Sequence, residues 1–287
     1  MRCTRCSKTA ISTKQALCKK HYAVWFEREV ARTIRHYKLF SKRERVAVAC
    51  SGGKDSTALL HLLQKLGYMV TAVAIDEGIH PYRDENLTFL KEYCTTNAVP
   101  LRVFSFKEAF GKDLDVMLPR GGPPCTVCGT FRRSLLDKVA HAFDVVATGH
   151  NADDEAQAVL MNLARANLDL FPRGGPVTTS NASGFVRRVK PFYFLTEKEI
   201  LTYALLRGIA GEWNECPYAS QAYRTTIRDA LNAYEEQHPG TKRKVLAHYL
   251  RVKEGLQVEE KGTVTCVSCG APSARGFCKA CRFKSKI

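Results

Sequence analysis

The sequence predicts an α/β protein with a doubly wound parallel sheet, flanked at both ends by small metal-binding modules. Short apolar runs alternate with helix-like periodicity between residues 45 and 148. A glycine-rich turn at residues 51–56 joins the first apolar run to the first helical segment. Pairs of cysteines with two-residue spacers lie near both ends of the chain. Strands that alternate with helices form parallel sheets, and such sheets bind ligands beyond the carboxyl ends of their strands.

The strand and helix ranges follow from apolar runs and their flanking residues. Strands are predicted over 45–50, 70–75, 101–106 and 144–148, and helices over 57–63, 84–96 and 129–143. The first, second and fourth strands each end in a polar turn, at 51–56, 76–78 and 149–151. We expect these turns to converge on one site. Cys50 and Cys94 are interpreted as small buried core residues.

Composition indicates a soluble protein with a polyanionic partner. No apolar run reaches the length of a membrane span, and no apolar leader follows Met1, so we expect a cytoplasmic protein without a membrane partner. The chain carries 44 Lys and Arg against 28 Asp and Glu, a net charge of +16. Such a surplus favours binding to nucleic acid, although an ordinary solvated surface is the alternative. Lys242, Arg243 and Lys244 form one basic cluster.

The terminal cysteines predict two structural zinc sites. Both sets have four nitrogen or sulfur ligands in two closely spaced pairs, which closes a tetrahedral site. The predicted ligands are Cys3, Cys6, Cys18 and His21 at one end, and Cys266, Cys269, Cys278 and Cys281 at the other. Each segment is too short to bury a core, so metal binding would supply its folding energy.

Four regions are expected from these motifs. Residues 1–25 form an N-terminal zinc finger and residues 26–215 the nucleotide-binding domain. Residues 216–262 form a helical region that binds RNA, and residues 263–287 form a C-terminal zinc finger.

The turn at 51–56, Ser-Gly-Gly-Lys-Asp-Ser, has the features of a phosphate-binding loop. A glycine-rich turn between a strand and a helix exposes backbone N–H groups at the positive end of the helix dipole. Lys54 adds a charge, and Ser51 and Ser56 add hydroxyl groups. The spacing differs from that of a Walker A loop, which disfavours a phosphoryl-transfer NTPase.

Three further cysteines remain in the middle of the chain. Cys125 and Cys128 are separated by two residues and follow a Gly-Gly-Pro-Pro stretch, and Cys216 precedes a proline. Three thiolates would leave one iron of a 4Fe-4S cluster without a protein ligand. A third zinc site is an alternative, but it lacks a visible fourth ligand.

These motifs together resemble those of a known family. The hexapeptide at 51–56 resembles the PP-loop of ATP pyrophosphatases, and residues 149–154, Gly-His-Asn-Ala-Asp-Asp, resemble the GHNxDD signature of PP-loop tRNA thiolases. With the zinc motifs, the C-x-x-C pair and the isolated Cys-Pro, nearly the whole chain resembles the tRNA 2-thiouridine synthetases of the TtuA type. That resemblance implies adenylation of a uridine C2 oxygen and its replacement by sulfur.

The resemblance also implies site residues and cofactors. Cys125, Cys128 and Cys216 would hold a 4Fe-4S cluster, and Asp154 would act at the uridine, with Lys54 and Asp55 as further catalytic residues. ATP, with Mg²⁺, would contact Ser51, Gly52, Gly53, Lys54, Asp55, Ser56, Asp76 and Gly149. Some relatives carry a lysine at the position of Arg132, and arginine cannot readily transfer a proton. Arg132, Arg133 and the cluster at 242–244 are candidate tRNA contacts.

Several alternatives stay open at this point. The same three cysteines could carry a persulfide and resolve it through a disulfide, without a cluster. The chain could also be a non-catalytic, zinc-dependent RNA-binding protein, which the complete hexapeptide disfavours. The target is either the wobble uridine, which the sequence at residues 75–79 and Ala152 favours, or a T-loop uridine. The family expectation is a homodimer that receives sulfur from sulfide or from a ubiquitin-like thiocarboxylate.

Overall fold

The computed structural model describes the chain except for a few short stretches. Those outside the description are residues 13, 122, 168–169, 179–185, 210, 212–213, 222, 257–263, 274 and 287. A six-stranded sheet forms the centre, in the order β3-β2-β1-β4-β6-β5. The strands are β1 (Arg45–Ala49), β2 (Met69–Asp76), β3 (Leu101–Ser105), β4 (Val145–Thr148), β5 (Val177–Thr178) and β6 (Arg188–Val189). All pairs are parallel except β5–β6.

The sheet is buried on both faces, as expected for a parallel sheet with continuous apolar strands. Val46 pairs with Val70 on one side and with Val145 on the other, so β1 lies centrally. Val46 and Val48 face one core, and Ala47 faces the other. The predicted doubly wound sheet is therefore confirmed.

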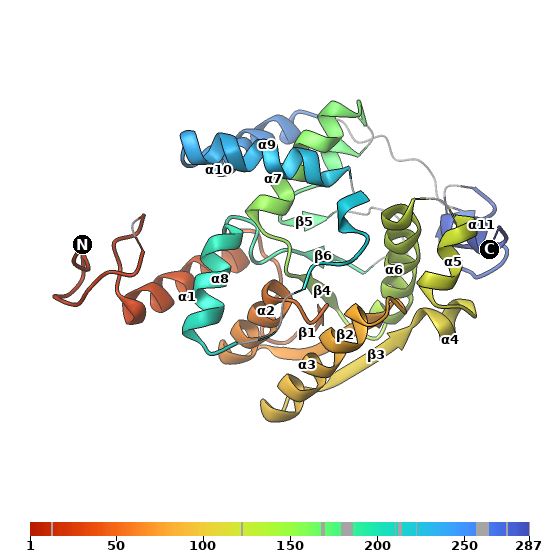
Figure 1. Cartoon of the computed structure of the whole chain (residues 1–287), viewed down its shortest axis with the longest axis horizontal. Coiled ribbons are helices and arrows are strands. Elements are labelled where there is room, and N and C mark those ends of the chain that lie inside the picture. Colours follow the sequence, from red (N-terminus) through yellow and green to blue (C-terminus); the bar gives the residue numbers. More distant parts are fainter. Residues whose placement is uncertain are drawn as a thin grey trace.

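Helices cover the two faces (Figure 1). The first core is formed with residues of α1 (Lys19–His36), α2 (Lys54–Lys65), α3 (Tyr82–Thr96) and α8 (Glu197–Leu206). The opposite face packs against α6 (Pro124–Ala140), with α4 (Phe106–Phe110) and α5 (Leu114–Gly121) beside it. No described helix is long and apolar enough to span a membrane.

A third group of helices lies beyond the sheet on the side of the strands' carboxyl ends (Figure 1). Helix α7 (Ala152–Ala164) packs against α9 (Arg224–Gln237) and α10 (Thr241–Glu254). Ala156, Tyr193, Leu246 and Tyr249 form the core of this group. Two 3-10 turns, η1 (Phe171–Arg173) and η2 (Ala219–Gln221), complete it.

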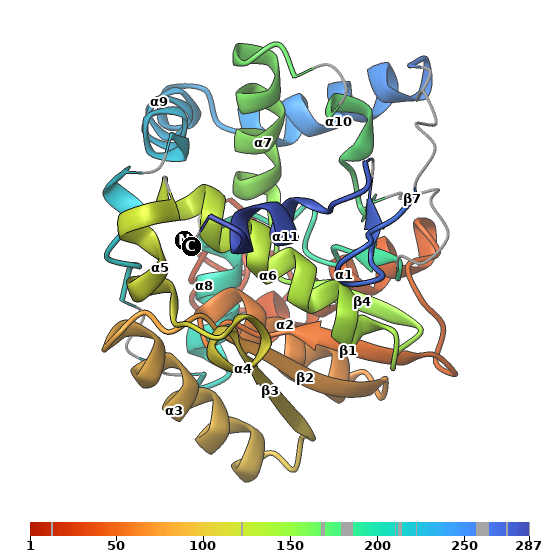
Figure 2. The same cartoon turned by 90° about the vertical axis from the view of Figure 1, so that its right-hand side faces the viewer.

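The terminal modules lie at opposite ends of the molecule (Figure 1), and Figure 2 views it from the end that carries the C-terminal module. The N-terminal segment joins the main core through Cys3, Leu17 and Cys18. The C-terminal module consists of β7 (Val264–Thr265), β8 (Pro272–Ser273) and α11 (Lys279–Lys284). It lies against α6, where the rings of Phe131 and Phe283 are 6.4 Å apart.

One predicted boundary differs from the structure in a way that matters for the site. The helix expected over 129–143 is α6, which begins at Pro124 and ends at Ala140. Proline is favoured at the first position of a helix, because its missing N–H would have no helical partner there. The cysteine pair therefore lies in the first turns of a helix rather than in a glycine-rich loop.

Candidate active site

The loop at residues 51–56 joins β1 to α2 and exposes the N-terminus of α2. Gly52 has a φ of +84°, and a Cβ there would lie 2.4 Å from the carbonyl oxygen of Asn86, so only glycine fits. The Ser51 amide donates to Ser56 Oγ over 3.1 Å, and Ser56 Oγ donates to the Gly53 carbonyl over 3.0 Å. These bonds hold the turn in place before any ligand binds.

The three polar turns at the strand ends converge on this loop. A Cβ on Gly149 would lie 2.9 Å from the Ser56 amide nitrogen, so the turn after β4 lies directly against the loop. From the first turn of α3, which follows the turn after β2, Arg83 Nη1 donates to the Ser51 carbonyl over 2.5 Å. Asp76 accepts a bond from the Gly78 amide over 3.0 Å, which shapes that turn.

Lys54 and Asp55 begin α2 and lie in a charged cluster. Lys54 Nζ is 2.6 Å from Glu197 Oε1 at the start of α8 and 3.4 Å from Asp55 Oδ2. Burial, with the nearby charges of Asp154 and Glu197, raises the pKa of Asp55 to about 7, although Lys54 opposes the shift. Its Oδ1 is buried without a hydrogen-bond partner among the described residues. This oxygen is therefore an acceptor that a cation or a proton could satisfy.

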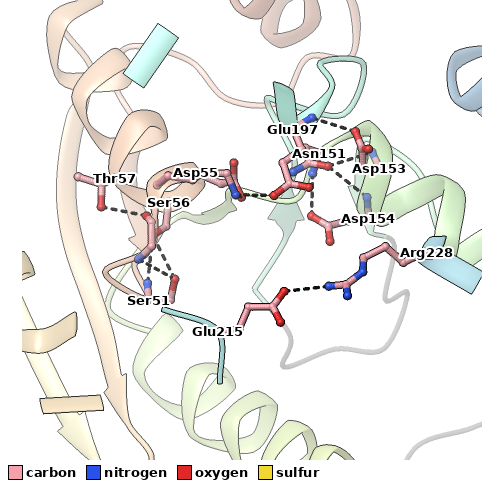
Figure 3. Close-up of polar contacts among 12 residues, drawn as sticks. Ser51, Asp55, Ser56, Thr57, Asn151, Asp153, Asp154, Glu197, Glu215 and Arg228 are labelled. Atoms are coloured by element: carbon pink, nitrogen blue, oxygen red, sulfur yellow. Dashed lines mark hydrogen bonds and ion pairs between the residues drawn. The ribbon is translucent and has the colours of Figure 1, made fainter. Parts of the chain in front are cut away.

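Asp154 lies across from this loop at the start of α7 (Figure 3). Asn151 caps the helix, because its side chain accepts bonds from the amides of Asp153 and Asp154. Asp154 Oδ2 accepts from the Asn151 amide over 3.3 Å, and its Oδ1 is 3.0 Å from Arg224 Nη1 on α9. The side chain is 29 % exposed, so it has both a capping role and an accessible face.

The neighbouring Asp153 is buried and explains one part of the basic cluster. It accepts a bond from the Glu197 amide over 2.8 Å and pairs with the ammonium group of Lys242. Lys242 is only 6 % exposed and also donates to Asn232, so this ion pair closes it off from a tRNA phosphate, contrary to the prediction.

The other two members of the basic cluster at 242–244 differ in exposure: Arg243 is half-buried, and Lys244 is not. Arg243 is bound to the Phe194 carbonyl and to Glu199. Lys244 is exposed.

Cys125 and Cys128 lie on one face of the first turns of α6, where the helix dipole favours negative charge. Cys125 is exposed and Cys128 is buried. Burial raises the pKa of Cys128 to about 11, although nearby Arg132 opposes the shift. Burial also raises the pKa of Cys216, with Cys125 close enough to contribute. The structure thus brings the three mid-chain cysteines together.

Arg132 and Arg133 follow one turn later on α6 and point to different partners. Arg132 Nε is 2.7 Å from Glu77 Oε1, and its Nη2 donates to Cys128 Sγ over 3.2 Å. Arg133 folds back over Gly129 and makes no ion pair with the described residues. Both arginines are exposed, but Arg132 reaches into the site through its contacts with Glu77 and Cys128, whereas Arg133 has no hydrogen bond or ion pair with either of these residues.

The N-terminal ligand set is gathered as one metal ion requires. The ligand atoms of Cys3, Cys6, Cys18 and His21 all lie within 4.8 Å of one another. The sulfurs of Cys6 and Cys18 are 3.7 Å apart, close to the ~3.8 Å edge of a tetrahedron with zinc–sulfur bonds of ~2.3 Å. Burial raises the pKa of Cys3, but hydrogen bonds from backbone amides and from His21 outweigh it and lower the pKa to about 6.

The C-terminal set has the same geometry. Cys266, Cys269, Cys278 and Cys281 also lie within 4.8 Å of one another, with 3.7 Å between the sulfurs of Cys269 and Cys278. The Cys278 amide donates to Cys266 Sγ over 3.2 Å and, with other backbone amides, lowers the pKa of Cys266 to about 6. Both sets can hold a metal ion.

Comparison with known proteins places the chain in a family. The model of the PP-loop domain matches residues 23–235. The tRNA-5-methyluridine(54) 2-sulfurtransferase of Pyrococcus horikoshii is 38% identical over 99% of this chain and 93% of its own length. The chain belongs to the PP-loop family of tRNA thiolases. Within it, the cytoplasmic tRNA 2-thiolation protein 1 of Drosophila melanogaster is 38% identical over 94% of this chain and 81% of its own length.

A solved member of this thiolase family has the same fold over nearly the whole chain. The U34-tRNA thiolase NcsA of Methanococcus maripaludis, determined with its 4Fe-4S cluster, superposes with a TM-score of 0.84. It is 30% identical, and the match covers 98% of this chain and 95% of that one. The family assignment predicted from the motifs is confirmed.

Sequence reasoning missed four charged residues that the structure places in the site. Glu77 lies in the turn at 76–78 that was expected to converge on the loop, so its position after a strand end could have indicated it, and its partner Arg83 lies in the first turn of α3. Glu197 and Arg224 contact Lys54 and Asp154 from elements far along the chain. No local pattern marks these two residues.

Proposed function

We propose that this thiolase adenylates the C2 oxygen of a tRNA uridine with ATP and replaces that oxygen with sulfur. One observation carries the proposal: a continuous series of contacts joins the loop at 51–56 to the cysteine site. Arg83 contacts the loop at Ser51, Glu77 contacts Arg83, and Arg132 contacts both Glu77 and Cys128. A nucleotide-binding end and a sulfur-binding end therefore belong to one site.

The first step would use the loop as a pyrophosphate cradle. The uridine C2 oxygen attacks the α-phosphorus of ATP, and pyrophosphate leaves. The amides at the start of α2 and the ammonium of Lys54 would stabilise the charge on the departing group. Lys54 would exchange its bond with Glu197 for one with phosphate. Asp55, with a free buried oxygen, is the residue we propose for Mg²⁺, and Asp76 and Gly149 complete the ATP site.

The second step requires a sulfur nucleophile at C2, from which AMP then leaves. Cys125, Cys128 and Cys216 would hold the 4Fe-4S cluster, whose chemistry when bound is to offer an iron without a protein ligand to sulfide. The donor set fits in its chemistry, because three thiolates are ligands of the kind that such clusters use, and Cys216 lies near enough to Cys125 and Cys128 for their charges to interact. Asp154, near the loop and partly exposed, would bind or deprotonate the uridine.

The terminal sets would hold one zinc ion each and stay structural, because all four positions of each site are filled by the protein. The four regions predicted from the sequence, 1–25, 26–215, 216–262 and 263–287, are retained in the proposal.

A groove of about 860 Å³ between α6 and the C-terminal module would receive the tRNA backbone. Its lining includes Arg133, Lys138, His141 and Lys279, and phosphates would replace solvent at these cations. Lys244 would add a contact from α10, and Arg243 a weaker one.

The target and the remaining partners complete the proposal. We propose the wobble uridine, on the sequence of residues 75–79 and the likeness to a U34 thiolase, whereas a T-loop 5-methyluridine is the target in the name of the Pyrococcus relative. A homodimer in the cytoplasm, supplied by sulfide or by a ubiquitin-like thiocarboxylate, follows the family expectation.

A reconstituted assay tests the function and the target together. Anaerobically purified protein, ATP, Mg²⁺, sulfide and unmodified tRNA should yield 2-thiouridine and AMP in equal amounts, located by digestion and mass spectrometry. Thiolation at the T-loop would replace the wobble target. Activity without bound iron would move the three cysteines to persulfide chemistry, and absence of ATP consumption would support an RNA-binding role alone. Asp154→Asn should lower the rate about 10²- to 10⁴-fold while the protein still binds tRNA.

A further inference from the structure

The series of contacts between Ser51 and Cys128 contains an arginine–glutamate–arginine triad, in which the side chain of Arg132 is 50 % exposed and the other two members are buried. Glu77 is 4 % exposed and Arg83 is 2 % exposed. Arg83 Nε lies 3.0 Å from Glu77 Oε2, and Arg132 Nε lies 2.7 Å from Glu77 Oε1. Each carboxylate oxygen thus has its own guanidinium partner, and each guanidinium has nitrogens left for a second contact.

The second contacts point to the two ends of the proposed reaction. Arg83 Nη1 donates to the Ser51 carbonyl over 2.5 Å, and Arg132 Nη2 donates to Cys128 Sγ over 3.2 Å. Glu77 and Arg83 are buried charges, which are costly unless they are paired, and each is the partner of the other. The triad contains two positive groups and one negative group, which leaves one positive charge directed at the cysteine sulfur and the phosphate loop.

We propose that Arg132 is a positioning residue for the sulfur end of the reaction, held by Glu77 and Arg83 at a fixed separation from the PP-loop. Its N–H group binds the sulfur of Cys128 and supplies positive charge beside the group that delivers sulfur. The inference rests on the proposed function for the meaning of the cysteine site. The contacts from which it is argued join residues of this chain and include no cofactor.

An arginine is needed for this role, which gives the departure from lysine-bearing relatives a physical reason. Arg132 reaches Glu77 with Nε and Cys128 with Nη2, two nitrogens of one rigid planar group. A lysine has a single nitrogen on a flexible stem, so it lacks the two separate, rigidly spaced nitrogens with which the arginine meets its two partners. In this chain the position therefore holds and orients the sulfur rather than transferring a proton.

Arg133 provides a matched control on the same helix. It carries the same charge one residue later, folds back over Gly129 and makes no hydrogen bond to a cysteine sulfur of the described residues. Replacing Arg133 with glutamine removes a positive charge near the cysteines without removing an N–H to sulfur bond. The difference between the two arginine variants isolates that bond from the general effect of charge.

The experiment compares wild type, Arg132→Gln, Arg132→Lys and Arg133→Gln, purified anaerobically. Iron and sulfide content, the reduction potential of the bound cluster and ATP affinity are measured. Hydrogen bonds to cluster sulfurs raise its potential. We expect Arg132→Gln to retain iron but shift the potential to more negative values, more than Arg133→Gln does. Arg132→Lys should behave like Arg132→Gln, and ATP affinity should change less than about twofold.

Two results would overturn the inference: Arg132→Lys with the wild-type potential, or equal shifts in Arg132→Gln and Arg133→Gln. Glu77→Gln is a second probe that should reproduce the Arg132→Gln shift if it folds.

Wild-type protein without iron would refute the cluster and not the inference. The same variants are then compared by alkylation of Cys128 in the native protein, mapped by mass spectrometry. Arg132→Gln should slow Cys128 several-fold and leave Cys125 unchanged. Equal Cys128 rates in all variants would refute the positioning role.

Discussion

The terminal cysteine sets and the mid-chain cysteines share a C-x-x-C spacing but form opposite environments. In the C-terminal set, backbone amides lower the pKa of Cys266 to about 6, and four ligands face one point. At the start of α6, burial raises the pKa of Cys128 to about 11, while Cys125 is exposed to solvent. The C-x-x-C spacing alone therefore does not distinguish the two kinds of site. They differ in the backbone amides around each sulfur, in its burial and in the number of ligands that face one point.

The same contrast extends to the carboxylates beside the open site. The terminal sets bring ligands together and leave no position for a substrate. Around the PP-loop, Asp55 retains a buried oxygen without a described partner, and its pKa is raised to about 7. This carboxylate therefore differs from the terminal ligands, whose partners in each set are all supplied by the protein. The following experiments test this contrast, from the largest expected effect to the smallest.

Loss of one ligand should abolish a closed site. Cys266→Ser is expected to lose roughly one zinc per chain and to expose the C-terminal module to protease, because metal binding supplies its folding energy. Zinc analysis and limited proteolysis measure both effects. Ser268→Ala, an exposed change between the same ligands, should leave both unchanged. Retention of zinc by Cys266→Ser would contradict a four-ligand site.

Loss of one ligand at the open site should remove iron without unfolding the protein. Cys216→Ala is expected to reduce iron from roughly four per chain to near zero, while zinc content stays the same. Thiolation should fall below detection, because sulfur is no longer held. Metal analysis and circular dichroism on the same samples separate these effects. Iron loss accompanied by zinc loss would mean that the two kinds of site are not independent.

The rate at which Cys128 reacts in metal-free protein should report the burial of its thiol. With a pKa of about 11 instead of about 9, native Cys128 should react with iodoacetamide at pH 7 about 100-fold more slowly than in the unfolded chain. Because the thiolate fraction rises until the pH passes the pKa, its rate should keep increasing through pH 9. Mapping by mass spectrometry gives each rate. A Cys128 rate that levels off near pH 7 would contradict the buried thiol.

Asp55→Asn should stabilise the nucleotide-free protein by about 4 kcal/mol at pH 8. The folded carboxyl has a pKa of about 7, raised above the unfolded value of about 3.9, so the unfolded state binds fewer protons between these values. Stability of the wild type therefore falls as the pH rises from about 4 to about 7, and the asparagine variant lacks this decline. Urea unfolding at pH 5 and pH 8 measures it, and an equal effect at both values would refute the shift.

Local sequence patterns predicted most of the fold, the loop at 51–56 and the terminal cysteine sets. The apolar runs at β1, β2, β3 and β4 gave the strands, because buried parallel strands are continuous in sequence. The loop at 51–56 and the terminal cysteine sets were predicted because each completes its chemistry within a few residues. The start of α6 was placed too late, since the glycines before it suggested a loop, whereas Pro124 begins the helix.

The amino-acid sequence by itself determined the sheet, the phosphate-binding loop, the metal-ligand sets and the family. These features depend on residues that are close in sequence and act through backbone geometry or short spacers. Only the tertiary structure decided which charges meet. It paired Lys54 with Glu197, Asp154 with Arg224, and Lys242 with Asp153, and it joined Cys128 to Ser51 through Arg132, Glu77 and Arg83. A long-range ion pair leaves no periodic signal in the sequence, because its partners come together only when separate helices pack.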